Sequence, residues 1–168
     1  MVMIVLRFVH VVSGAIWVGM MAFMTLFLMP AVNEAGPEGG KLMVALQRRR
    51  VPVYLPILAL VTIVSGLWLF QRLSGGQFGA YLATPAGLAF GLGGLAAIVG
   101  FVVGVAGARP TMTRFAKIAE SLPTATPEQR PALMAEMQRL RVRGASIQKG
   151  VMVLLGLALA AMAVARYV

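Results

Sequence analysis

The chain has 168 residues, about the size of one domain, with 60% hydrophobic and only 12% charged residues. An ordinary soluble domain has roughly 25% charged residues, so this composition excludes a soluble fold with a charged surface. The net charge of +10 comes from cations next to apolar runs. We interpret them as orientation signals and contacts with anionic lipids of the bilayer, and we expect no nucleic-acid binding. The absence of Cys excludes disulfides, iron–sulfur clusters and thiolate-bound zinc.

Four apolar runs are long enough to be membrane spans. Each approaches the roughly 20 residues that an α-helix needs to cross the hydrocarbon core. The first is interrupted only by Arg7 and His10, and no basic segment precedes it, so we expect a span and not a secretory signal. The predicted spans cover about residues 3–29, 51–73, 87–108 and 148–168.

Lys and Arg are distributed unevenly between these spans. Twelve of the 15 lie after the first span or between the third and the fourth, whereas Arg7, Arg72 and Arg166 lie at the opposite ends. Cytoplasmic loops carry the excess of Lys and Arg. We therefore predict that segments 31–50 and 109–147 are cytoplasmic, and that both termini and the loop 74–86 face outward. The chain would then be a multi-pass protein of the bacterial inner membrane.

The two cytoplasmic segments are predicted to be helical. Residues 38–50 have the pattern of a short amphipathic helix at the membrane surface. In the longer segment, Thr126-Pro127-Glu128-Gln129 reads as an N-cap, a proline at the first helical position and a capping Gln. A helix from Ala132 to Gln148 should follow and continue into the fourth span. A preceding helix over 111–122 should end before Pro123, giving a helical hairpin that is either solvated or docks a partner.

The fold class that follows is all-α: an integral membrane four-helix bundle forming a single domain over residues 1–168. Both termini are outside, and a cytoplasmic helical hairpin joins the third and fourth spans. The third span is rich in glycine, and the pairs Gly87/Gly91 and Gly100/Gly104 are each four residues apart. This spacing lets helix backbones approach closely in lipid. We expect it to serve packing within the bundle, with a self-association face as the alternative.

His10 is the only histidine in the chain, and it lies inside the first span. An ionisable group inside a membrane is costly, so it usually faces the bundle interior and has a partner or a function. His10 lies about seven residues, or roughly 10 Å, from the outer end of its span. Trp17 follows on the same helical face. Antiparallel alignment of the spans puts Trp68 and Met162 at a similar depth, with Arg7 and Arg72 nearer the outer surface.

These residues have the chemistry of a haem b site. Haem b needs an axial nitrogen or sulfur ligand, an apolar slot and cations for its propionates. We predict His10 as the axial metal ligand, with Met162 as a possible second ligand, Trp17 and Trp68 beside the porphyrin, and Arg7 and Arg72 near the propionates. In the simpler interpretation, His10 hydrogen-bonds to Ser13, Ser65 or a carbonyl, and the tryptophans are membrane anchors.

The first 70 residues resemble three related membrane families. The matching residues are Arg7-x-x-His10 followed by Trp17-x-Gly19, then Arg48-Arg49 and Ser65-Gly66-Leu67-Trp68-Leu69. The families are the copper-resistance D proteins, the membrane-bound bacterial protoporphyrinogen oxidases and the membrane domain of certain bacterial urate oxidases. The resemblance implies a haem-associated four-helix bundle with His10 as axial ligand. The third span lacks the lysine and histidines of the oxidase family, which argues for an uncharacterised relative rather than a full protoporphyrinogen oxidase.

Three functions remain open. The first is a haem b protein with a redox, electron-transfer or haem-handling role; if it is an enzyme, it would be a haem-dependent membrane oxidoreductase. The second is a non-catalytic accessory subunit of a larger membrane complex, or a homodimer. The third is a copper-handling protein, since thioethers such as those of Met20, Met21 and Met24 suit Cu(I). These methionines can equally be apolar filler. A hydrolase is poorly supported because every Glu lies at or beyond the inner membrane surface.

Overall fold

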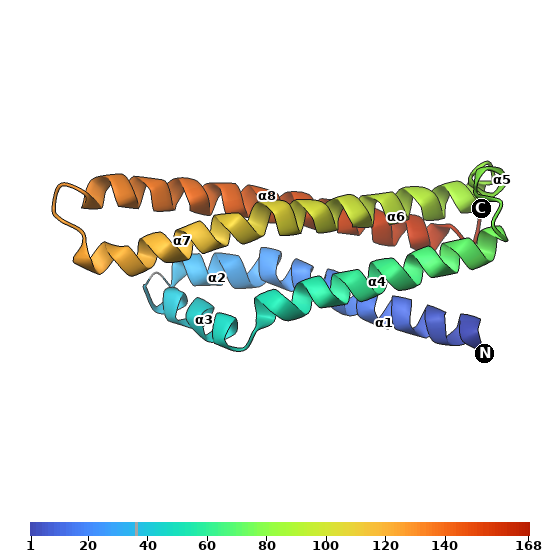
Figure 1. Cartoon of the computed structure of the whole chain (residues 1–168), viewed down its shortest axis with the longest axis horizontal. Helices are drawn as coiled ribbons and strands as arrows, with labels where there is room; N and C mark the ends of the chain where they lie inside the picture. The colour runs from blue at the N-terminus through green and yellow to red at the C-terminus, as the bar shows by residue number, and fades with distance from the viewer. Residues whose placement is uncertain (36) are drawn as a thin grey trace.

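The computed structural model describes residues 1–35 and 37–168, without the side chains of residues 37, 38, 40 and 41. Within this part of the chain every regular element is helical, and there is no strand. Figure 1 shows long helices lying side by side, with both termini and α5 at one end, here called the terminal end. The elements are α1 (Val2–Phe23), the π-helical turn η1 (Met24–Leu28), α2 (Met29–Glu34), α3 (Pro37–Arg48), α4 (Val51–Ser74), α5 (Phe78–Leu82), α6 (Pro85–Val103), the π-helical turn η2 (Gly104–Ala108), α7 (Arg109–Ser121), the 3₁₀ turn η3 (Leu122–Thr124) and α8 (Arg130–Val164).

The chain is a multi-pass membrane protein with four candidate spans. The four continuous helical segments are Val2–Glu34, Val51–Ser74, Pro85–Thr124 and Arg130–Val164, and each contains an apolar stretch long enough to cross a bilayer. Only about a fifth of each stretch is buried within the chain. Large apolar side chains therefore face outward all around the bundle, as lipid contact requires.

The helices that contain the first and third spans continue past residues 29 and 108 because they run through proline. Pro30 lies at the start of α2 and Pro110 at the start of α7, and a π-helical turn precedes each of them. A proline lacks the backbone donor and crowds the preceding turn. A local π-helical turn and nearby hydroxyls can absorb both effects inside a membrane helix. Thr25 and Thr111 each donate a hydrogen bond at 2.7 Å to a carbonyl one turn earlier on the same helix, that of Met21 and that of Gly107.

The bundle consists of two hairpins, α1–α4 and α6–α8, joined by contacts of α4 with α6 and of α1 with α8. Trp17 is the largest side chain of the common core, where it packs with residues from the other three long helices. The two hairpins bury positions at matching sequence spacings. Ser13 and Trp17 of α1 correspond to Gly93 and Ala97 of α6, and Ala59 and Thr62 of α4 correspond to Leu155 and Ala158 of α8. Leu69 of α4 corresponds in the same way to Ala165, which directly follows α8.

The predicted helical hairpin is present, and its second helix begins two residues before the predicted Ala132. The Gln129 side chain accepts a hydrogen bond from the Thr126 amide at 3.3 Å, but the N-cap of α8 is Gln129 and not the predicted Thr126. α8 begins at Arg130 with a proline in its first turn, so Pro127 lies in the turn before the helix and not at the predicted first helical position. α8 then runs without a break into the fourth span, as predicted, and ends at Val164, before the predicted limit of 168. Arg114 of α7 pairs with Glu136 of α8 and ties the hairpin together.

Three glycines of α6, Gly87, Gly91 and Gly93, make close contacts within the chain. A Cβ added to Gly87 would overlap the Tyr81 carbonyl, and one added to Gly91 would lie 2.6 Å from Leu82. These two glycines therefore let α5 pack closely against α6. A Cβ on Gly93 would lie 3.1 Å from the Ala158 carbonyl oxygen, which makes Gly93 a close contact between α6 and α8. Glycine-rich helices in lipid commonly use such small residues to bring backbones together.

Candidate functional site

His10 belongs to a polar seam between α1 and α4, formed by His10 and Ser13 of α1 and Thr62 and Ser65 of α4. Ser13, Thr62 and Ser65 are buried, and His10 is partly buried. His10 Nδ1 lies 2.8 Å from the Thr62 carbonyl oxygen, and Thr62 Oγ1 lies 2.9 Å from Ser13 Oγ. Each hydroxyl also reaches a carbonyl one turn earlier on its own helix, for example Ser13 to Val9 at 2.6 Å. The seam thus satisfies its polar groups in an otherwise apolar setting.

The contact with Thr62 determines which nitrogen of neutral His10 carries the proton. A carbonyl oxygen can only accept, so Nδ1 must donate, and neutral His10 then has an unprotonated Nε2. The Ser65 hydroxyl lies farther from Nδ1, at 3.4 Å, and donates to the Val61 carbonyl instead at 2.6 Å. A ring N–H donated to a backbone carbonyl is the arrangement that orients metal-ligating histidines.

Nε2 of His10 is open to a ligand from outside the chain. Among the described residues, Nε2 has no hydrogen-bond partner, and no buried side-chain nitrogen or oxygen lacks one. Nε2 is therefore not enclosed by the protein. Towards its N-terminus, α1 diverges from the α6–α8 hairpin, while α4 runs between them (Figure 1). Within the chain, α1 makes most of its contacts with α4.

Gly66 allows the imidazole to pack against α4. A Cβ added to Gly66 would lie 2.7 Å from His10 Cε1 and 3.1 Å from Nδ1. These distances are shorter than an ordinary van der Waals contact between carbon atoms, about 3.5–4.0 Å. At the sequence spacings that relate the two hairpins, Phe90 and Met162 occupy the positions of His10 and Gly66. The imidazole niche is therefore specific to the first hairpin.

The other predicted site residues lie in different settings. Trp17 is 4% exposed in the central core, and Trp68 is 46% exposed. Arg7 and Arg72 are exposed on α1 and α4 towards the terminal end. Met162 is partly buried, with its Cγ about 3.3 Å from the position of a Cβ on Gly93. The contacts thus join His10 to α4 and Met162 to α6, and the assembly of all six residues around one cofactor stays a prediction.

Sequence reasoning missed Thr62 and Gly66. A carbonyl partner for His10 was among the alternatives, but a backbone atom has no sequence signal of its own. Gly66 was noted only as part of a family-like segment. The useful signal was the spacing Thr62–Ser65–Gly66, which places two hydroxyls and a small residue on one face of α4 at the depth of His10.

Comparisons of the chain with protein-family models, with curated proteins and with solved structures found no match. The described residues also contain no group of three or more His, Cys, Asp or Glu side chains that could hold a metal ion. The site is therefore characterised by its own geometry: one oriented imidazole, backed by a backbone carbonyl and a glycine, within a membrane helix pair.

Proposed function

We propose that the protein binds haem b through Nε2 of His10 and has a redox, electron-transfer or haem-handling role. The observation that carries the proposal is the 2.8 Å contact of His10 Nδ1 with the Thr62 carbonyl, which leaves Nε2 unprotonated and orients the ring. Haem brings four nitrogen ligands of its own, so it requires from the protein as little as one axial side chain. One oriented imidazole meets that requirement. Bound haem would supply one-electron chemistry.

The remaining residues fit this role in part. Arg7 and Arg72 are exposed cations nearer the terminal end than His10 and could pair with propionates at the membrane boundary. A second axial ligand could be absent, could be Met162 after a rearrangement, or could be the same histidine of a second copy. Trp68 is exposed and could contact a porphyrin, whereas Trp17 is buried in the core and would support the helices around the site. The resemblance of the first 70 residues to haem-associated membrane families supports the same reading.

Copper is the alternative cofactor, and the donor set favours it less. A copper ion in a protein usually needs several ligands from the chain, and His10 is the sole imidazole. A non-catalytic accessory subunit of a larger membrane complex is the alternative without a cofactor. In that case the polar seam would serve only to join α1 to α4, and His10 would be a structural histidine.

The proposed setting is the bacterial inner membrane, with both termini outside and the α7–α8 hairpin in the cytoplasm. The support is the charge asymmetry, with twelve of 15 cations on one side. These cations would also contact anionic lipids at the cytoplasmic surface.

The test is the haem content of protein produced with supplied haem and purified in detergent. Wild type should show a Soret band with about one haem per chain or per pair of chains, and His10→Ala should lose it while keeping its helicity. Ser65→Ala is the matched control, because it removes a hydroxyl of the same seam and leaves the contact between His10 and Thr62 intact. It should retain the pigment. A colourless wild type, or full pigment in His10→Ala, would end the haem proposal and favour the accessory subunit.

A further inference from the structure

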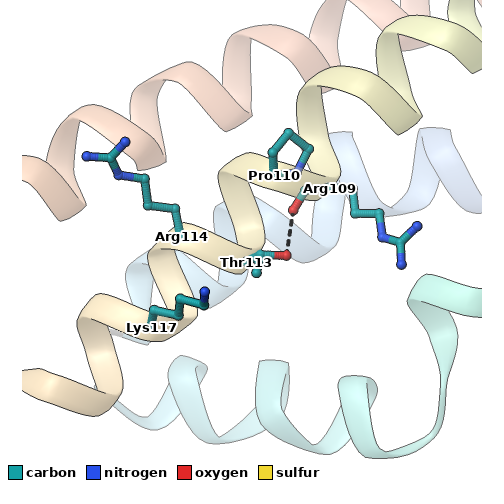
Figure 2. Close-up of a pocket in the computed structure, with 5 residues that line it drawn as sticks. All are labelled: Arg109, Pro110, Thr113, Arg114 and Lys117. Carbon is teal, nitrogen blue, oxygen red and sulfur yellow. Dashed lines mark hydrogen bonds between the residues drawn. The ribbon is translucent and has the colours of Figure 1, made fainter.

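A basic groove lies on one face of α7, just beyond the third span. Arg109, Pro110, Thr113, Arg114 and Lys117 line it, and its volume is about 460 Å³. Figure 2 shows these residues along successive turns of α7, with Arg109 and Arg114 extending to opposite sides of the helix. The Thr113 hydroxyl donates to the Arg109 carbonyl at 3.0 Å. All five residues are exposed, whereas Thr111 and Ile118 on the opposite face are buried.

The groove has an excess of positive charge. Three of the lining side chains are cations: Arg109, Arg114 and Lys117. Among the described side chains, only Arg114 of these three forms an ion pair, with Glu136 of α8. One carboxylate against three cations leaves a surplus of two positive charges at Arg109 and Lys117. An anion with several oxygens can contact both side chains, because Lys and Arg donate hydrogen bonds readily to phosphate.

The groove lies at the level of lipid headgroups. The stretch Pro85–Ala108 is uncharged, and at 1.5 Å per residue it is about 36 Å long, slightly more than the roughly 30 Å hydrocarbon core. Arg109 is the first charged residue after it. Lys117 lies about 12 Å further along the helix, and its flexible stem can bring the ammonium back towards the membrane surface.

An apolar surface adjoins the groove on the membrane side. Val102 and Val103, at the end of α6, are 54% and 37% exposed. A ligand that fits both surfaces has an anionic head and apolar chains. A free phosphate ion could use only the cations, and an exposed groove with few enclosing walls would hold it weakly.

We propose that this groove binds the phosphate headgroup of an anionic phospholipid, with Arg109 and Lys117 as its principal contacts and acyl chains along Val102 and Val103. The proposal rests on the membrane placement of the third span and is independent of the haem proposal. The lipid would contact the start of α7, where the continuous helix Pro85–Thr124 passes from the span into the hairpin.

The test is native mass spectrometry of the detergent-solubilised protein, titrated with phosphatidylglycerol or with phosphatidylcholine of the same acyl chains. Phosphatidylglycerol should bind the wild type more tightly. Each basic residue near a membrane surface contributes about 1 kcal/mol of attraction, so Arg109→Gln/Lys117→Gln should weaken the binding about 30-fold. The same variant should bind phosphatidylcholine as the wild type does. Because both side chains are exposed, its helicity and thermal stability without lipid should not change.

The matched control is Arg139→Gln/Arg143→Gln, which removes the same charge from exposed positions of α8 outside the groove. It should bind phosphatidylglycerol nearly as tightly as the wild type. If this control loses as much affinity for phosphatidylglycerol, the binding depends on the net charge of the protein and not on the groove, and the proposal is wrong. Equal binding of phosphatidylcholine, or full displacement of phosphatidylglycerol by millimolar inorganic phosphate, would overturn the lipid assignment. None of these outcomes depends on whether haem is bound.

Discussion

The contact of Gly66 with His10 makes a quantitative prediction. In Gly66→Ala the new Cβ would lie 2.7 Å from His10 Cε1, so the imidazole must move away from α4. Overpacking of this kind costs about 1–3 kcal/mol, and loss of the bond between His10 and Thr62 would add about 0.6 kcal/mol, the average for hydrogen bonds between membrane helices. The higher helix propensity of Ala offsets about 1 kcal/mol. We expect Gly66→Ala to lower the free energy of unfolding by roughly 0.6–2.6 kcal/mol.

The matched control is Gly94→Ala, because a Cβ on Gly94 would have no atom within 4 Å. This variant gains the same helix propensity without the contact, so its stability should rise by up to about 1 kcal/mol. The assay is reversible unfolding by sodium dodecyl sulfate from mixed micelles, followed by loss of helical circular dichroism. In a His10→Ala background, Gly66→Ala should behave like Gly94→Ala, because the clash is gone. Equal stabilities of Gly66→Ala and Gly94→Ala in the wild-type background would refute the packing of His10 on Gly66.

Three further predictions follow from the packing and the charge pattern. Gly93→Ala should be less stable than Gly104→Ala by about 1 kcal/mol, because a Cβ on Gly93 would lie 3.1 Å from the Ala158 carbonyl oxygen, whereas one on Gly104 would meet one atom at 3.9 Å; the same denaturant titration compares them. Trp17→Ala should cost about 3–5 kcal/mol, as expected for a large aromatic residue removed from a core, and a smaller loss would contradict its central position. Reporter fusions after Gly76 and Pro123 should give opposite signals, external and cytoplasmic, and the reverse pattern would overturn the proposed orientation.

Much of the fold could be predicted because apolar length and charge placement are strong signals in membrane proteins. The four candidate spans depend on residue types within one segment. The unbroken continuation of the first and third helices through Pro30 and Pro110 has a local cause. Pro30 and Pro110 indicate helix ends in a soluble protein, but here π-helical turns carry the helix through both. A π-helical turn involves several backbone groups, so no single residue type predicts it.

The candidate site was predictable only in its central residue. His10 is prominent as the sole histidine, and its position in a span makes it a candidate functional residue. Its actual partners are the carbonyl of Thr62 and the bare backbone of Gly66, and both depend on how α1 and α4 align in register. Depth matching along straight helices can place residues at one level. It cannot say which of them face each other, and Trp68, predicted at the depth of His10, is 46% exposed.

The most direct test of the central claim is ¹⁵N NMR of protein labelled with [¹⁵N]histidine, in which every imidazole signal belongs to His10. At mildly alkaline pH, where free imidazole is neutral, we predict a protonated Nδ1 and an unprotonated Nε2. One equivalent of haem should then shift the Nε2 signal, or broaden it beyond detection, through a bond to iron. A proton on Nε2 without haem, or an Nε2 signal that an equivalent of haem leaves unchanged, would contradict His10 as the axial ligand.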